Sequence, residues 1–170
     1  MYEPAFRTAS RLGWQSLQGQ PELFDVGPFT SLDPDALTEK ALHYLGHETH
    51  CSASGLLRVS NHHGQITLYR SRPVDDFFLR AMQQRMVSIY CASVGHAVAE
   101  PELEEKILGD AVPGPYEPPR SLLAVPMLCQ GRVSGVLAIA SIFPEAFHSW
   151  DLYMLSAAAA QASDALDEAG

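Results

Sequence analysis

The chain has 170 residues, which fits one domain and is short for two. Hydrophobic residues make up 46% of it and charged residues 18%, so a core can form and disorder of the whole chain is excluded. The net charge of −9, with only 11 Lys plus Arg, argues against nucleic acid and anionic membrane surfaces as partners.

The three cysteines, Cys51, Cys91 and Cys129, are widely spaced and form no CxxC pair. Their odd number disfavours a disulfide framework, and their spacing disfavours a structural zinc site. The N-terminal sequence MYEPAFRTASRLGWQ lacks the apolar core of a signal peptide, and the apolar runs at 121–126 and 133–142 are too short to span a bilayer. We therefore expect a soluble, cytoplasmic protein with reduced thiols.

Residues 1–31 contain apolar side chains without a steady period, and glycines and prolines interrupt any long element. A short helix near 5–18 is compatible with the pattern. We expect the rest of this segment to be an arm that packs on the domain or on a partner, with the domain itself at 32–170.

A helix is predicted at 33–50, where Asp33 suits the N-cap and Pro34 the first helical position. One face carries the apolar residues Leu37, Ala41, Tyr44 and Leu45. Another carries His43, His47 and His50, with Cys51 four residues after His47, a spacing that could hold a metal ion or contact a haem edge. Because this histidine face points away from the apolar one, we expect a solvated surface or a dimer contact instead.

A β-hairpin follows, with strands at 52–60 and 66–72 and the turn sequence NHHGQ between them. Asn61 and Gly64 provide the turn chemistry, and we expect His62 and His63 to be exposed turn residues.

The second long helix is predicted at 75–94, after Pro73 and Asp75 and before the stop at Gly95. Its apolar stripe could line a pocket, although we favour a place in the core; the stripe consists of Phe78, Met82, Met86, Ile89 and Tyr90. Pro101 and the sequence ELEEKIL predict a short helix at 101–108, and the proline-rich stretch at 109–120 predicts a loop.

Two strands, at 121–129 and 132–141, are joined by Gln130-Gly131 in the best hairpin signal of the chain. In the second strand, alternation places Val133, Gly135, Leu137 and Ile139 on one face, opposite Ser134, Val136, Ala138 and Ala140. Neither face is strongly polar, so we expect both to be covered, with Gly135 allowing a helix to approach the sheet. Ser149 is predicted to cap a last helix, which runs to about residue 168 with Asp151 in its first turn.

The predicted order α-β-β-α-α-β-β-α indicates an antiparallel α+β sandwich. Within it, residues 121–166 resemble the C-terminal half of GAF domains. The matching features are Val125-Pro126-Met127, the turn at Gly131, the strand 133–137, the pattern Phe147-x-x-x-Asp151-Leu152-x-x-Leu155, and an alanine-rich final helix. The resemblance implies a GAF-like (profilin-like) fold over 32–170, an antiparallel sheet sandwiched between helices, and does not cover residues 1–31.

The resemblance also implies a sensory or regulatory domain for signal transduction that is not an enzyme and binds an unknown small ligand. Polar and apolar residues expected near its cavity are Arg58, Tyr69, Met86, Tyr90, Arg120 and Ser121. An arginine at the mouth would suit a carboxylate or a phosphate.

The known ligand chemistries of the family do not fit the sequence, so the cofactor stays open. The Asn-Lys…Phe…Asp-Glu set of cyclic-nucleotide-binding relatives cannot be placed, and no Cys-His dipeptide exists for a covalently attached bilin. Related reductases of free methionine sulfoxide carry cysteines in the segment before the Val-Pro step, whereas residues 92–128 contain none here. No Ser–His–Asp set or phosphate loop is visible, and a thiol enzyme is the least favoured alternative.

The last helix carries a seam spaced 3, 4, 3 and 4 residues apart, as in a coiled coil, formed by Leu152, Leu155, Ala159, Ala162 and Leu166. Its alanines permit close approach, either to the sheet or to a second copy. In GAF families this helix commonly pairs with its twin, so the resemblance implies a homodimer through the seam and the helix at 33–50. A pure dimerisation module with a self-filled pocket is the alternative function.

Overall fold

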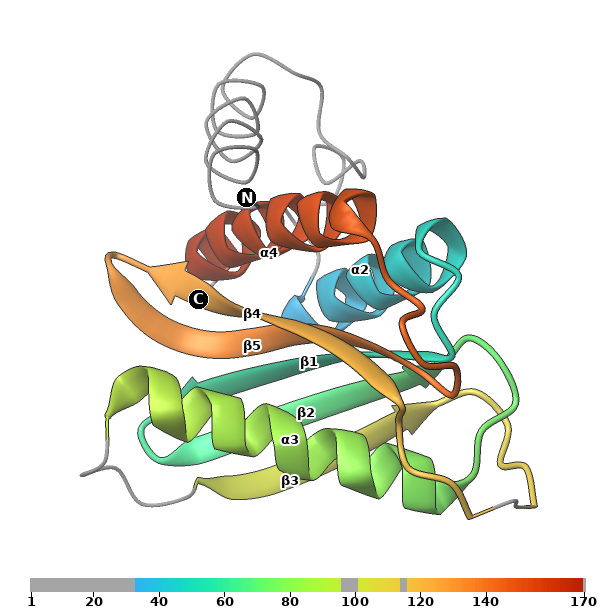
Figure 1. Ribbon diagram of the computed structural model, residues 1–170. Helices are drawn as coiled ribbons and strands as arrows, with labels where there is room; N and C mark the ends of the chain where they lie inside the picture. Colours follow the sequence, from blue (N-terminus) through green and yellow to red (C-terminus); the bar gives the residue numbers. More distant parts are fainter. Residues whose placement is uncertain (1–32, 96–100, 114–115, 170) are drawn as a thin grey trace.

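The computed structural model describes residues 33–95, 101–113 and 116–169, which form one five-stranded sheet between helices (Figure 1). The expected arm at 1–31, with its short helix near 5–18, lies outside these residues. The strand order is β3-β2-β1-β5-β4. The strands are β1 (Ala53–Ser60), β2 (His63–Arg70), β3 (Glu102–Leu108), β4 (Ser121–Cys129) and β5 (Arg132–Ser141).

Helices cover both faces of this sheet, as the sequence predicts. Helices α2 (Pro34–Glu48) and α4 (Ser149–Ala169) lie side by side on one face, and α3 (Asp76–Val94) lies on the other (Figure 1). A separate apolar cluster fills each of the two interfaces. No helix in the described ranges is long and apolar enough to cross a bilayer.

Helix α2 begins as the sequence predicts. Asp33 accepts a hydrogen bond from the backbone N–H of Ala36 at 2.7 Å, and Pro34 occupies the first turn. His43 and His47 are exposed, as expected for the polar face. The helix ends at Glu48, so His50, at φ 54°, lies beyond it and not on the predicted histidine face.

The first hairpin has a shorter turn than predicted. Only Asn61 and His62 form it, with φ values of 50° and 68°, the left-handed conformation that a two-residue type I′ turn needs. His63 is therefore the first residue of β2, paired with Ser60, and Gly64 lies within the strand opposite Val59.

Helix α3 confirms the core interpretation of its apolar stripe. Asp75 accepts a hydrogen bond from the N–H of Phe78 at 2.8 Å, and Gly95, at φ 106°, ends the helix. Phe78, Met82 and Met86 have at most 1% of their surface exposed and pack against the sheet.

The predicted helix at 101–108 is wrong, because Glu102–Leu108 forms strand β3, parallel to β2. Glu, Leu and Lys favour a helix locally, but the free edge of β2 supplies a full row of backbone partners for this segment. The order of the described elements is thus α-β-β-α-β-β-β-α, and the sheet is mixed rather than wholly antiparallel.

Strands β4 and β5 have the predicted bounds, but a bulge changes which side chains share a face. Met127 pairs with Gly135 and Leu128 with Val133, so Ser134 has no partner residue across the ladder. The extra residue shifts the alternation, and Val133 packs with Val136 in the cluster under α3. Its predicted place beside Leu137 is therefore wrong.

Gly135 is needed for a different contact from the one predicted. A Cβ atom at this position would collide with the carbonyl oxygen of Leu57 in the neighbouring strand β1. The glycine therefore allows two strands, not a helix and the sheet, to approach each other.

Helix α4 begins at Ser149, and Asp151 accepts a hydrogen bond from the N–H of His148 at 2.8 Å. The residue in front of the helix is thus His148, one position before the predicted cap. Leu155, Ala159 and Ala162 of the predicted seam are 0–4% exposed and pack against the sheet and α2. These three residues of the seam therefore contact their own chain, whereas Leu152 and Leu166 are only partly buried.

Candidate functional site

A groove of about 750 Å³ lies on the face of the sheet that carries α2 and α4. It is formed by the end of the sheet where the two hairpins turn, and by the last turns of α4. Figure 1 shows the C-terminal end of α4 beside the end of β4, close to the turn into β5. The volume of the groove lies within the range of binding sites for small molecules.

Arg58 supplies the arginine of this groove. It lies near the end of β1, between Gln65 of β2 and Gly135 of β5, and its side chain is partly buried. Within the described ranges its guanidinium has neither a hydrogen bond nor an ion pair. A partly desolvated guanidinium without an acceptor is a ready binding group for a carboxylate or a phosphate.

Ser163 supplies a second free polar group from the opposite wall. It lies on α4 and keeps 5% of its surface exposed, and its buried hydroxyl has no hydrogen-bond partner among the residues that the structure describes. A buried hydroxyl that makes no hydrogen bond costs free energy, so such groups commonly face a ligand or a water molecule. Ser134, the unpaired residue of the bulge, adds a hydroxyl that donates to the carbonyl of Met127 at 3.3 Å.

Three carboxylates lie around these groups, and each already has a partner of its own. Glu104 accepts a hydrogen bond from Nε2 of Gln65 at 3.4 Å, and a carboxylate oxygen of Glu102 lies 3.6 Å from Nδ1 of His63. Asp167, on α4, accepts from the thiol of Cys129 at 2.9 Å. None of the three forms an ion pair with Arg58.

Of the six residues predicted to bind a ligand, Arg58 alone lines this groove. Met86 and Tyr90 are buried in the cluster beneath α3, on the other face of the sheet. Tyr69 lies on the groove's face but farther along β2, where its ring stacks on His43 with centroids 4.2 Å apart.

The remaining two predicted residues lie at the opposite end of the sheet from the groove. The backbone N–H of Arg120 donates to the carbonyl of Ser141 at 2.9 Å, and its side chain is exposed. The hydroxyl of Ser121 donates to the carbonyl of Phe143 at 2.5 Å and accepts from the N–H of Ala146 at 3.1 Å. Both residues make hydrogen bonds that hold the start of β4 to the end of β5 and the residues after it. The structure does not place them near Arg58.

Sequence reasoning missed the groove residues Ser163 and Asp167, although Ser163 gave a signal. In the alanine-rich helix it is a polar residue that directly follows the buried seam position Ala162 and lies one turn after Ala159. A polar side chain on the buried face of a helix predicts either an internal hydrogen bond or a contact with something bound. No local pattern links Asp167 to the sheet, because Cys129 is 38 residues away.

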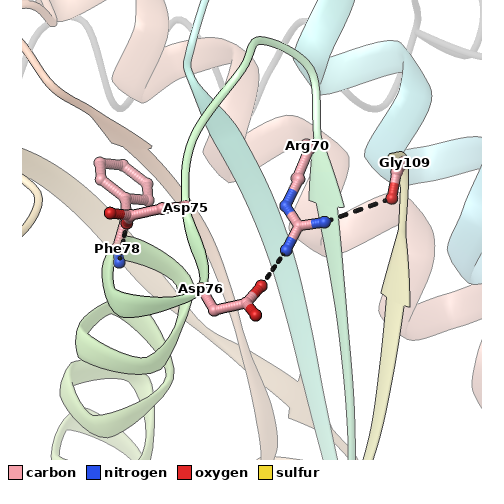
Figure 2. Close-up of polar contacts among 5 residues, drawn as sticks. All are labelled: Arg70, Asp75, Asp76, Phe78 and Gly109. Carbon is pink, nitrogen blue, oxygen red and sulfur yellow. Dashed lines mark hydrogen bonds and ion pairs between the residues drawn. The ribbon is translucent and has the colours of Figure 1, made fainter. Parts of the chain in front are cut away.

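A second polar cluster joins three segments at the other end of the sheet (Figure 2). Arg70, the last residue of β2, donates to the carboxylate of Asp76 at the start of α3 and to the carbonyl of Gly109 at 3.4 Å. The Arg70 side chain is 5% exposed. Two described buried atoms of this region, Nε of Arg70 and Oδ2 of Asp75, have no hydrogen-bond partner. Because its terminal nitrogens are both engaged, we assign this arginine a structural role.

The three cysteines are free thiols in different segments: Cys51 lies between α2 and β1, Cys91 on α3 and Cys129 at the end of β4. Burial raises the pKa of the Cys51 thiol, and the hydrogen bond to Asp167 raises the pKa of the Cys129 thiol. Both effects favour the neutral thiol over the nucleophilic thiolate. Among the described residues, no cluster of three or more His, Cys, Asp or Glu is arranged to hold a metal ion.

The chain is similar to known proteins in two comparisons. A family model described as GAF domain matches residues 33–166. Among solved structures, the chain is similar to the GAF domain from an Acinetobacter phosphoenolpyruvate-protein phosphotransferase, at 17% sequence identity and a TM-score of 0.47. That alignment covers 98% of this chain and 94% of the other. No curated protein matches the chain.

Proposed function

Because the chain belongs to the GAF domain family, we propose that it is a regulatory domain that senses a small ligand bound between α4 and the sheet. GAF domains are in general sensory and regulatory modules that bind small molecules. The observation that carries the proposal is that Arg58 of the sheet and Ser163 of α4 line the same groove, and that neither side chain has a partner within the described part of the chain.

The position of the groove suggests how binding would act on the domain. Arg58 belongs to the sheet, whereas Ser163 and Asp167 belong to the last turns of α4. A ligand that contacts both walls adds bonds between α4 and the sheet, and so favours one arrangement of this helix. In a homodimer that uses the outward faces of α2 and α4, this change would reach the second copy.

We further propose that the domain has no catalytic activity and acts in the cytoplasm. Free cysteines fit a reducing compartment. The raised pKa values of Cys51 and Cys129 disfavour the thiolates that a methionine sulfoxide reductase would need, and the two thiols lie on different elements.

A dimerisation module that binds no ligand is the second candidate. This function is favoured by the packing between α3 and the sheet. Phe78, Met82 and Met86 fill that interface and have almost no exposed surface. The groove under α4 differs from this apolar interface because polar side chains line it. Whether a ligand binds in that groove decides between the two candidate functions.

The test is a thermal-shift screen of the full chain against a panel of metabolites, with native mass spectrometry of the purified protein. A ligand is expected to raise the melting temperature, since binding to the native state alone stabilises it. The shift should disappear in Arg58→Gln and persist in Arg80→Gln, which changes an exposed arginine of α3 outside the groove. If no compound shifts the parent, the dimerisation module is the better account. If a compound shifts both variants alike, it binds outside the groove and the proposed site is wrong.

A further inference from the structure

Strand β3 forms one edge of the sheet and buries little side-chain surface. Five of its seven residues are exposed, and the other two are only partly buried. Strand β4, at the opposite edge, has only two exposed residues among nine. In the described sheet β3 also runs parallel to its neighbour, whereas the other three pairs of strands are antiparallel. Because burial of apolar surface is the main stabilising contribution, little of it fixes β3 in place.

The side-chain contacts of β3 with β2 and α2 lie at the surface of the described structure. They pair Glu102 with His63 at 3.6 Å, Glu104 with Gln65 at 3.4 Å, and Lys106 with Glu39 at 2.6 Å. Water screens exposed ion pairs, so each adds little to stability. Leu103 packs against the apolar cluster under α3, but it is only partly buried. The docking of β3 therefore depends mainly on its backbone ladder with β2.

The composition of β3 opposes its conformation. The sequence ELEEKIL consists mainly of residues that favour a helix, and glutamate and lysine are depleted in strands. Glu102 and Glu104 also lie on one face of the strand, two residues apart, where their like charges repel. A segment whose local preference opposes its place in the fold gains less free energy from docking than one made of strand-forming residues.

The position of β3 connects its docking to the groove. Glu102, Leu103 and Glu104 form the side of the groove that lies beyond β2. At the other end of the strand, Arg70 donates to the carbonyl of Gly109, directly after β3, and so bounds the weakly held segment. Without β3 at the edge, the groove would lose this side.

We propose that β3 detaches from β2 as a unit while the other four strands of the sheet stay folded, and that its docking completes the groove. A molecule that contacts β3 in the groove stabilises the docked state, and so couples occupancy of the groove to the edge of the sheet. The detachment depends on the contacts of β3 alone, whereas its regulatory use rests on the proposed ligand-sensing function.

The experiment is hydrogen exchange of the full chain without added compounds, followed by mass spectrometry at urea concentrations below the unfolding midpoint. After correction for intrinsic rates, residues 102–108 should exchange at least about tenfold faster than residues 121–129 at the other edge. Their exchange should be nearly independent of urea, because local opening exposes little surface, whereas exchange in β1 and β5 should accelerate with urea. Equal protection of the two edges, or equal urea dependence of β3 and β1, would overturn the proposal.

A substitution in the centre of the sheet tests whether β3 opens by itself. Ile139→Val shortens a fully buried side chain of β5 and should accelerate exchange in β1 and β5 about fivefold. It should leave exchange in β3 unchanged, since β5 is equally folded whether β3 is docked or detached. Acceleration of β3 by the same factor as β1 would mean that β3 opens only when the whole domain unfolds.

A substitution in β3 tests why the strand is weakly held. Glu105→Thr, at an exposed position outside the groove, replaces a helix-favouring residue with a strand-favouring one. It should slow exchange in β3 about threefold, because it stabilises the docked state by part of the strand-propensity range. An unchanged rate would contradict the account of weak docking given by the composition of β3.

These outcomes are distinct from those of the ligand screen. A strand β3 that opens only with the whole domain overturns the detachment and leaves the ligand-sensing function standing. A screen in which no compound shifts the melting temperature removes that function, and the detachment is then decided by hydrogen exchange alone.

Discussion

At the scale of single residues, the stability of the sheet depends on positions where neighbouring backbones come close. Such a position tolerates either no side chain or a fully buried one. Gly135 and Cys51 are the clearest cases. Gly135 faces the backbone of β1 beside the bulge at Ser134, and Cys51 is fully buried in front of β1. Each makes a prediction that concerns one side chain.

Gly135→Ala is expected to lower the free energy of unfolding by about 3 kcal/mol, because its Cβ would collide with the Leu57 carbonyl in a backbone that cannot move freely. The measurement is urea denaturation followed by circular dichroism. Gly55→Ala is the matched control. Its Cβ would meet only the ends of the Leu68 and Met86 side chains, which can shift, so its loss should be smaller. Equal losses would contradict this account.

Cys51 predicts a dependence of stability on alkaline pH. Burial raises the pKa of the folded-state thiol above its ordinary value of 9.0. Its contribution to stability is therefore complete below pH 9.0 and is lost as the pH rises through the folded-state value. Between pH 7 and pH 10, the parent should lose more stability than Cys51→Ala in urea denaturation.

The comparison with Cys51→Ala isolates the contribution of the thiol to the pH dependence of stability. Tyr44 and Tyr90 also have pKa values raised by burial, but they titrate in both proteins. The same loss in parent and variant would mean that Cys51 becomes accessible to water before the chain unfolds.

At the scale of elements, Arg70 connects β2, the start of α3 and the residue after β3 (Figure 2). Its side chain is nearly buried, whereas that of Asp76 is 68% exposed, so water screens the ion pair. The hydrogen bond to Gly109 also fixes the start of the proline-rich loop at 109–120. Gly109, at φ 97°, would bring a Cβ within 3.0 Å of the Arg70 side chain.

Arg70→Ala should therefore lower the free energy of unfolding by about 2 kcal/mol, through two lost hydrogen bonds and the packing of the side-chain stem. Hydrogen exchange should show faster exchange in β3 and the first turn of α3. Arg72→Ala, at an exposed position two residues later, is the control and should change stability by less than about 0.5 kcal/mol. Similar effects of the two substitutions would contradict the claim that the Arg70 side chain holds these three segments together.

At the scale of the whole molecule, the predicted homodimer needs a surface other than the seam. Leu155, Ala159 and Ala162 already pack inside the chain. The outward side of α4 carries Tyr153, Ser156 and Ala160, which are small or partly apolar. We propose this stripe as the contact of the predicted dimer.

Light scattering of the full chain should give twice the mass of one chain at micromolar concentration, and Ala160→Arg should shift the equilibrium to the monomer. Gln84→Arg, at an exposed position of α3 on the other face, should leave the dimer intact. A parent that stays monomeric at high concentration would contradict both the dimer and its role in signalling.

Local chemistry made much of the fold predictable. The caps Asp33 and Asp75 and the turn Gln130-Gly131 act over three or four residues, so α2, α3 and the β4–β5 hairpin could be placed from the sequence. The ordered residues of 121–166 were sufficient to indicate the family. Of the residues that line the groove, sequence reasoning predicted only Arg58 as a ligand-binding residue.

The tertiary structure decided three features that no local pattern contains. Residues 102–108 become a strand only because β2 offers a free edge, the bulge at Ser134 reverses the face of Val133, and the groove forms where α4 crosses the hairpin ends. Each depends on contacts between residues far apart in the chain, as with Cys129 and Asp167, 38 residues apart. By itself, the sequence determined α2, α3 and α4, the strong hairpin and the family. The packing of these elements decided which polar side chains face one another.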